Sequence, residues 1–181
     1  MEKDPELFSQ QATIHEYEKK IQELDGLNRV LKVLRLSKDS WYYGKVIVGH
    51  ALGENANTEL AMEAWGKAKF MLRRLGQKIE GIIIHYDQDG VYIGHRWLHQ
   101  VAVKDKVRVS YSDNGAKGNV YSESFIGRFK SENRLLFWEQ EDFEGLEEVV
   151  KARIKYYNRV RRHSALGNKS PIEYLNRKTN I

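Results

Sequence analysis

The apolar positions of the chain follow two spacings that predict alternating strands and helices. Runs rich in β-branched residues predict three strands, at 45–52, 82–87 and 107–110. Apolar residues three and four apart predict helices at about 58–75, 95–104, 122 onward and 142–157, and Ser170-Pro171 opens a last turn. Because strands and helices alternate, the pattern indicates an α/β fold.

The residues before the first predicted strand carry a helical pattern of their own. A near-heptad seam predicts a helix from about 13 to 36, with apolar residues at Ile14, Tyr17, Ile21, Leu24, Leu31 and Leu34. A dimer contact and an amphipathic helix packed on its own domain both agree with this seam. Ser37 is a candidate cap of a short further helix. We therefore expect a helical segment, 1–44, before a core at 45–181.

Helix boundaries can be predicted most closely for the helix at 58–75. Thr58 is the expected N-cap, with Glu59 in the first turn, and Gly76 is the expected stop signal. The stripe on this helix is expected to face the core, at Leu60, Ala64, Trp65, Ala68, Met71 and Leu75.

Two carboxylates stand where they would form a metal site. Asp87 ends the strand at 82–87, and open α/β sheets build their sites at the carboxyl ends of strands. Glu123 follows after 35 intervening residues and shares a predicted helix face with Lys130. Carboxylates bind hard cations such as Mg²⁺, and two such ions about 3.5–4 Å apart catalyse phosphoryl displacement. The alternatives are a strand-end turn for Asp87 and a helix N-terminal charge for Glu123.

Charge is concentrated at the C-terminal end. Residues 151–181 contain nine Lys or Arg and one acid, a charge of +8, so the net charge of +5 leaves −3 on the first 150 residues. A basic block of this kind suggests an anionic partner such as nucleic acid, although a solvated basic tail has the same composition.

Composition narrows the class of protein further. At 181 residues, with 41% apolar residues, the chain is long enough for one domain with a real core. The absence of cysteine excludes disulfides, thiol catalysis and cysteine zinc sites. The sequence shows neither a signal peptide nor an apolar run near 18 residues, so we expect a cytoplasmic protein without membrane contact.

Several short motifs together resemble one family. They lie at 85–92, 110–112, 115–119, 122–125, 129–132 and 157–167, the last reading Tyr-Asn-Arg-Val-Arg-Arg-His-Ser-Ala-Leu-Gly. This set is similar to the catalytic core of DDE insertion-sequence transposases, which is of the retroviral-integrase type. The 35-residue gap between two acids and a basic residue seven positions after the Glu also match. The resemblance runs from about Lys45 to Leu175.

The resemblance implies a ribonuclease-H-like fold, the integrase core, and roles for particular residues. It makes Asp87 and Glu123 the second and third catalytic carboxylates, which bind Mg²⁺ or Mn²⁺. The residues expected to contact DNA are Lys117, Lys130, Arg159, Arg161, Arg162 and His163.

One part of the family pattern is missing. The first strand of that fold carries the first catalytic Asp, but the expected Trp-x-x-Asp-x-Thr pattern is absent, and residues 31–44 read as helix end and loop. Asp39 is the nearest acid, with no apolar strand before it. We therefore expect an internal deletion near 40–45, an incomplete fold with an N-terminal helical segment, and weakened metal binding.

These observations leave open whether the chain is an enzyme. The first hypothesis is a transposase-type protein that cleaves and joins DNA at element ends and target, impaired in this chain. The alternative is a non-catalytic DNA-binding or oligomerising fragment, whose partner is a second copy or a full-length transposase. An unrelated ribonuclease-H-like nuclease would need a third carboxylate, for which Asp39 is the candidate.

Overall fold

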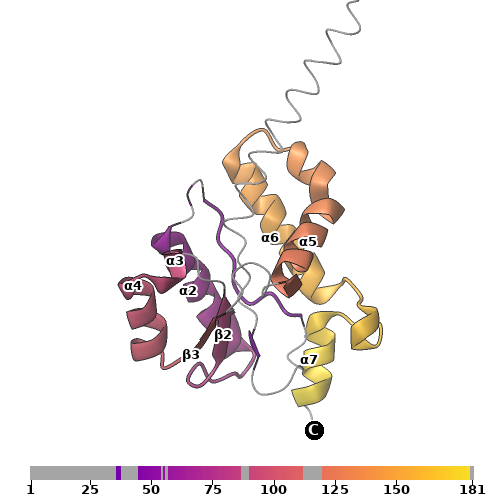
Figure 1. Ribbon diagram of the computed structural model, residues 1–181. Helices are drawn as coiled ribbons and strands as arrows, with labels where there is room; N and C mark the ends of the chain where they lie inside the picture. Colours follow the sequence, from indigo (N-terminus) through magenta and orange to yellow (C-terminus); the bar gives the residue numbers. More distant parts are fainter. Residues whose placement is uncertain are drawn as a thin grey trace, which may run out of the picture.

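The computed structural model describes residues 36–37, 45–53, 55, 57–86, 90–111 and 120–179. At some of these, including 85–86 and 120–123, it describes the backbone alone. Figure 1 shows a small sheet with α2, α3 and α4 on one side of the molecule and α5, α6 and α7 on the other. Most of the predicted N-terminal segment 1–44 lies outside the described residues.

In the described part of the chain, the sheet has three strands in the order β1-β2-β3, namely Leu36–Ser37, Ile83–Tyr86 and Arg108–Tyr111. The last two are parallel, in a register that pairs Ile84 with Val109, and they confirm the predicted strands at 82–87 and 107–110. The prediction of helix end and loop at Leu36–Ser37 is wrong. These residues pair antiparallel with Ile84 and Ile83, because the backbone of a buried strand needs hydrogen-bond partners on both sides.

The connection from β2 to β3 is helical, as predicted. It consists of α3 (Gly90–Ile93), α4 (His95–Leu98) and the π-helical turn η1 (His99–Lys104). Trp97 and Val101, four residues apart, are both fully buried and fix the inner face of this segment. The predicted helix at 95–104 is therefore confirmed in extent, although its second part is wider than an α-helix.

Helix α2 (Thr58–Arg74) covers the sheet, and its first cap differs from the prediction. Asn57 is the N-cap, not Thr58, and its side-chain oxygen accepts a hydrogen bond from the Leu60 amide at 2.9 Å. The stronger N-cap preference of Asn explains the shift of one residue. The stop is confirmed, since the chain leaves the helix through Gly76 at φ +68°.

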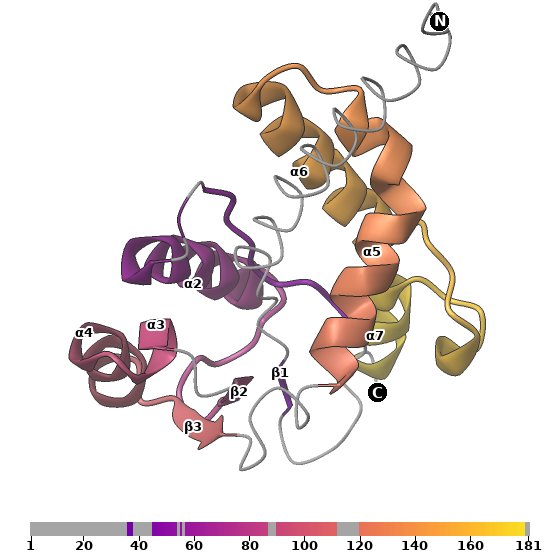
Figure 2. The same cartoon turned by 45° about the horizontal axis from the view of Figure 1, so that its top comes forward.

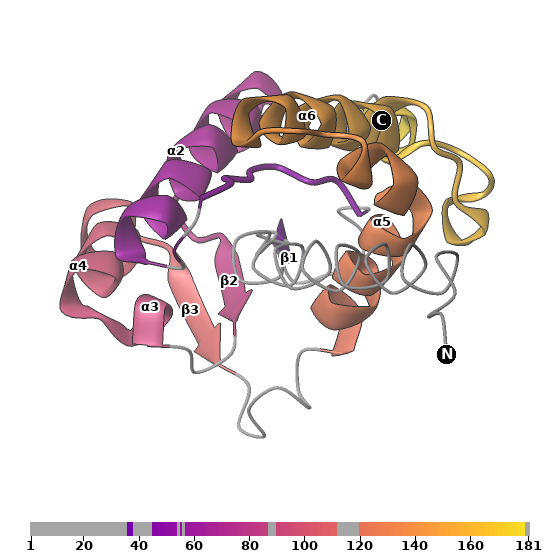
Figure 3. The same cartoon turned by 90° about the horizontal axis from the view of Figure 1, so that it is seen from above.

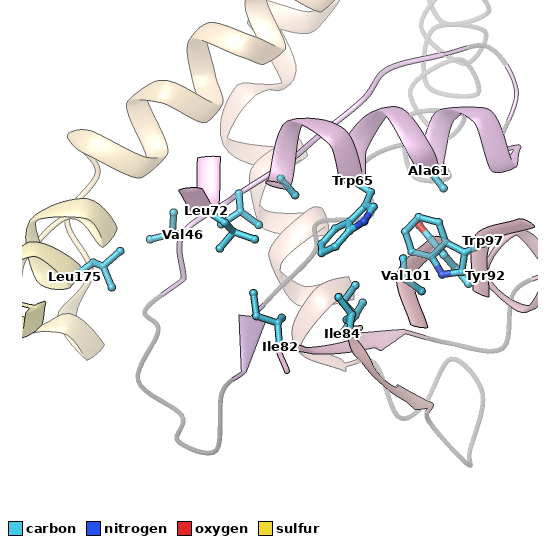
Figure 4. Packing of buried hydrophobic residues seen from close by; sticks show 13 residues of the cluster. Val46, Ala61, Trp65, Leu72, Ile82, Ile84, Tyr92, Trp97, Val101 and Leu175 are labelled. Atoms are coloured by element: carbon cyan, nitrogen blue, oxygen red, sulfur yellow. The ribbon is translucent and has the colours of Figure 1, made fainter. Parts of the chain in front are cut away.

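The side chains between α2, the sheet and α4 form one hydrophobic cluster, which we call the sheet cluster. Figure 4 shows Trp65 of α2 reaching toward Ile82 and Ile84, with Tyr92 and Trp97 packed at one end. Its buried members are Val46, Val48, Ala61, Trp65, Ala68, Leu72, Ile82, Ile84, Tyr92, Trp97, Val101, Val107 and Leu175.

A carboxylate joins α2 to the end of the π-helical turn. Asp105 accepts hydrogen bonds from Trp65 Nε1 at 2.7 Å, Gln100 Nε2 at 2.8 Å and Lys69 Nζ at 3.0 Å. Burial alone would raise the pKa of Asp105, but these donors and the Lys69 charge outweigh it, so the pKa lies below 3.8. Asp105 therefore stays ionised and fixes α2 over the crossover.

The C-terminal part is a helical pair followed by a short helix. Helix α5 (Val120–Trp138) begins two residues before the predicted start, and α6 (Phe143–Arg159) begins one residue after the predicted start, with Asp142 as its N-cap. A 3₁₀ turn, η3 (Ser164–Leu166), and α7 (Pro171–Thr179) complete the chain. A second cluster, the helical cluster, comprises Ile47, Leu52, Phe125, Phe129, Phe137, Val150, Ile154 and Tyr157.

The predicted strand at 45–52 is wrong, because no strand is assigned to these residues in the described part of the chain. Lys45 is exposed at φ +41°, whereas most of 46–52 is buried. Its side chains alternate as in a strand, with Val46 and Val48 in the sheet cluster and Ile47 in the helical cluster. Figure 3 shows this run passing between α2 and α5 beside α6. Instead of a neighbouring strand, the Asn158 side chain bonds Ile47, donating to its carbonyl and accepting from its amide at 2.8 Å each.

Candidate active site and nucleic-acid interface

The segments that carry the two predicted catalytic acids start from one edge of the sheet. Strands β2 and β3 are parallel, so both carboxyl ends lie at the same edge, and Figures 2 and 3 show α5 beginning on that side. Tyr86, the last residue of β2, directly precedes Asp87, which lies outside the described residues. The backbone of Glu123 is in the first turn of α5, and its side chain is not described.

Helix α5 is held in place by its aromatic side. Phe125 and Phe129 are buried in the helical cluster, and Phe125 packs edge-to-face on Tyr157 of α6 with ring centroids 5.1 Å apart. Lys130 is half-buried, and it shares the helix face of Glu123 by spacing alone. Lys117, the other predicted DNA contact near this edge, lies outside the described residues.

The basic segment after α6 contains cations in two different environments. Arg159 and Arg162 are exposed. Arg161 instead pairs with Glu132 of α5, with its Nε donating at 2.9 Å, and lies over the Tyr157 ring. This contact raises the pKa of Arg161 and fixes the segment against α5.

His163 is buried, with 7% of its surface exposed. Its ring packs edge-to-face on Tyr157 at 4.9 Å, and its amide donates to the Lys169 carbonyl. Burial, and next the Arg161 charge, lower the pKa of His163 to about 4, so the imidazole is neutral at pH 7. These features favour a packing role for His163 over the predicted contact with phosphate.

Comparison with known proteins now adds to this geometry. Residues 105–171 match the integrase core domain, a stretch that includes β3, α5 and α6 and reaches the first residue of α7. This stretch of the chain is therefore similar to an integrase core domain. That family has a ribonuclease-H-like fold, and a small sheet with a parallel β2–β3 pair, flanked by helices, agrees with an incomplete version of it.

A relative supports the same family. The insertion element IS600 uncharacterized 31 kDa protein of Shigella sonnei is 34% identical over 133 residues, which cover 71% of this chain and 46% of that protein. The chain thus spans about half the length of this curated relative. No solved structure matches the chain.

The described part of the chain does not include a complete metal centre. Within it, no group of three or more His, Asp or Glu side chains could hold a metal ion. The expected donors, Asp87 and Glu123, are oxygen ligands of the kind that Mg²⁺ and Mn²⁺ prefer. In the same part of the chain, no helix is long and apolar enough to cross a bilayer.

Sequence reasoning gave no role to Asn158, although it belongs to the motif at 157–167. Its signal was present in the pattern, since Asn158 is an amide on the buried face of α6, next to Tyr157 and four residues after Ile154. A polar side chain in such a position needs a hydrogen-bond partner, which the Ile47 backbone supplies.

Proposed function

We propose that this chain is a DNA-binding, transposase-type integrase core whose ability to cleave and join DNA is impaired. The observation that carries the proposal is the integrase core match over residues 105–171. This stretch contains both α5, on which Glu123 stands, and the basic residues that follow α6. The relative from an insertion element supports the same class of reaction.

In this proposal Asp87 and Glu123 hold Mg²⁺ or Mn²⁺. The parallel strands support it, because Asp87 follows β2 at the edge from which the chain leads to α5. When bound, such an ion supplies a metal-activated water or hydroxyl for attack on a phosphodiester. The two carboxylates bind and orient the ion, and two anionic ligands hold it more weakly than three would.

The proposed impairment rests on the sequence before the core, in which the Trp-x-x-Asp-x-Thr pattern is absent. Among the described residues before α2, Leu36–Ser37 pair with β2 and no strand is assigned to 46–52. The absent pattern supports an internal deletion before residue 45 that removed the first catalytic Asp. We propose that the N-terminal segment 1–44, of which Leu36–Ser37 pair with β2, is joined directly to the core 45–181 at this point.

DNA binding is assigned to the exposed cations. Arg159 and Arg162 extend from the end of α6 and are free to neutralise phosphates, which positions a protein on nucleic acid. Lys130 and Lys117 remain proposed contacts nearer Glu123. Arg161 has a different role in this proposal, because its guanidinium already pairs with Glu132.

The salt dependence of DNA affinity tests this assignment. Removal of one phosphate contact by Arg162→Ala should lower the slope of log affinity against log salt by about 1, measured by fluorescence anisotropy with duplex DNA. Arg73→Ala, an exposed change at the end of α2, is the matched control and should leave the slope unchanged. Equal slopes for wild type and Arg162→Ala would remove Arg162 from the interface.

The alternative function, a non-catalytic fragment that associates with another transposase chain, is favoured by one surface feature. Large apolar side chains are exposed where α5 meets α6, with Leu135 at 70% and Phe143 at 43% exposure. Exposed apolar groups of this size often mark protein contacts. Both functions include DNA binding, and they differ in whether any strand cleavage accompanies it.

A further inference from the structure

Two histidines form a pair on the outer surface of the crossover. His95 begins α4 and His99 begins η1, four residues later, so both point from the same side of a helical turn. Their rings are nearly parallel, at an interplanar angle of 14°, with centroids 5.9 Å apart. Both side chains are exposed.

The neighbouring residues explain why both rings face outward. Trp97 and Val101 are fully buried in the sheet cluster and set the inner face of the segment. Arg96 is turned toward α2, where it pairs with Glu59. Within the residues that the structure describes, neither imidazole has a hydrogen bond or an ion pair, so no structural contact accounts for the pair.

We propose that His95 and His99 are a two-imidazole site for a first-row transition-metal ion such as Zn²⁺, Ni²⁺ or Cu²⁺. Imidazole suits these ions, and two histidines one helical turn apart are a known metal-binding arrangement. Metal–nitrogen bonds of about 2.0–2.1 Å require the rings to approach each other, which rotation of exposed side chains permits. Water completes the coordination, since the described residues provide no cluster of three ligands.

This site differs in chemistry from the proposed Mg²⁺ site. Mg²⁺ prefers oxygen ligands and keeps its water, so it does not compete for imidazole. An ion held by His95 and His99 would also connect α4 to the π-helical turn. This turn contacts the segment before β3, because the Val101 carbonyl accepts a hydrogen bond from the Val107 amide at 2.8 Å. Because the ion binds the folded form, it should stabilise the chain against unfolding.

The test is Ni²⁺ titration by calorimetry on the full chain without a polyhistidine tag, at about pH 8, where free imidazole is neutral. Excess Mg²⁺ is added to occupy carboxylate sites. We expect one strong Ni²⁺ site in wild type, weakened about tenfold or more in His95→Ala and in His99→Ala, because each variant loses the chelate. The Ni²⁺-dependent rise in Tm should disappear in the same two variants.

Arg96→Ala is the control variant, because it lies between the two histidines and removes a cation without removing a ligand. It should bind Ni²⁺ at least as tightly as wild type. The metal-free Tm of His95→Ala and His99→Ala should match wild type, since both side chains are exposed. Unchanged Ni²⁺ affinity in both histidine variants would overturn the site, whatever the outcome for DNA binding.

Discussion

Two runs of the chain with almost the same composition have different structures. The runs 82–84 and 46–48 each consist of three β-branched residues, and the buried ones are Ile82, Ile84, Val46, Ile47 and Val48. The first pairs with β1 and β3, while the second is in no sheet. The comparison shows that side-chain pattern predicts an extended, buried backbone, whereas a sheet also needs a neighbouring strand to supply hydrogen bonds.

The run without a strand partner is held by one side chain. Asn158 provides both an acceptor and a donor to Ile47, which is what an adjacent strand would offer at one residue. Strand-like alternation persists, with neighbours of Ile47 in one cluster and Ile47 in the other. The buried Asn158 side chain therefore replaces the backbone hydrogen bonds that one residue of a neighbouring strand would make.

The largest effect is expected when this replacement is removed. Asn158→Leu keeps a similar volume but leaves the buried amide and carbonyl of Ile47 without their side-chain partner. At about 1–3 kcal/mol for each buried unsatisfied group, the free energy of unfolding should fall by about 2–6 kcal/mol, measured by urea denaturation.

Lys155→Ala, an exposed change on the same helix, is the control and should alter stability by less than about 0.5 kcal/mol. If Asn158→Leu is as stable as wild type, the Ile47 backbone must have another partner. The proposed substitution of a side chain for a strand would then be abandoned.

The glycine directly after the run 46–48 should give the next largest effect. A Cβ on Gly49 would overlap the Ala64 carbonyl oxygen and lie 2.8 Å from Ala68 Cβ, because the run passes directly against α2. Gly49→Ala should therefore cost about 1–3 kcal/mol through overpacking, measured as a lower urea midpoint.

Gly66, on the helix that this run contacts, should have the opposite effect on stability. It lies in α2, and a methyl group added there would have nothing within 4 Å, so Gly66→Ala should stabilise the chain by about 0.5–1 kcal/mol. Equal changes in the free energy of unfolding for Gly49→Ala and Gly66→Ala would mean that the run does not approach α2 closely.

The smallest effect on stability is expected from His50, two residues after the run 46–48. Burial, and next the Lys67 charge, lower its pKa from 6.5 to about 4, while Glu63 opposes this and Lys151 adds to it. The unfolded chain therefore binds a proton that the folded chain does not, so stability falls as pH decreases from about 6.5 to about 4. His163 adds a change of the same sign.

Thermal unfolding between pH 7.5 and pH 4 measures this dependence. His50→Gln removes the titrating group and should reduce the loss of Tm over that range, leaving the part due to His163. An identical pH dependence in the variant would show that His50 is not buried in its neutral form.

Much of the fold could be predicted because it depends on local signals. The spacing of Ala64, Trp65 and Ala68 and the start at Asp142 placed helices within a few residues. The pairing of Leu36–Ser37 with β2 could not be predicted, since two residues carry no pattern and only the available edge of β2 explains them. The strand predicted at 45–52 was wrong for a related reason. Side-chain pattern does not show whether a neighbouring strand is present to form a sheet.

The residues of the candidate site could be predicted, but their partners and burial could not. Motif spacing identified the integrase core, which the comparisons support over 105–171. It could not distinguish exposed Arg162 from Arg161, because the Glu132 partner of Arg161 lies on another helix. It also could not show that His163 is buried, since its contacts come from α6 and from the chain near Lys169.

Our main proposal is that this integrase core binds DNA but has lost the carboxylate set needed for efficient strand cleavage. The decisive assay is cleavage and joining of DNA carrying the ends of its own element, with Mg²⁺ or Mn²⁺, under conditions where binding is established by anisotropy. We predict salt-sensitive binding with little or no cleavage. Cleavage that requires Mg²⁺ and is lost in Asp87→Asn or Glu123→Gln, at the rate of an intact transposase, would contradict this proposal.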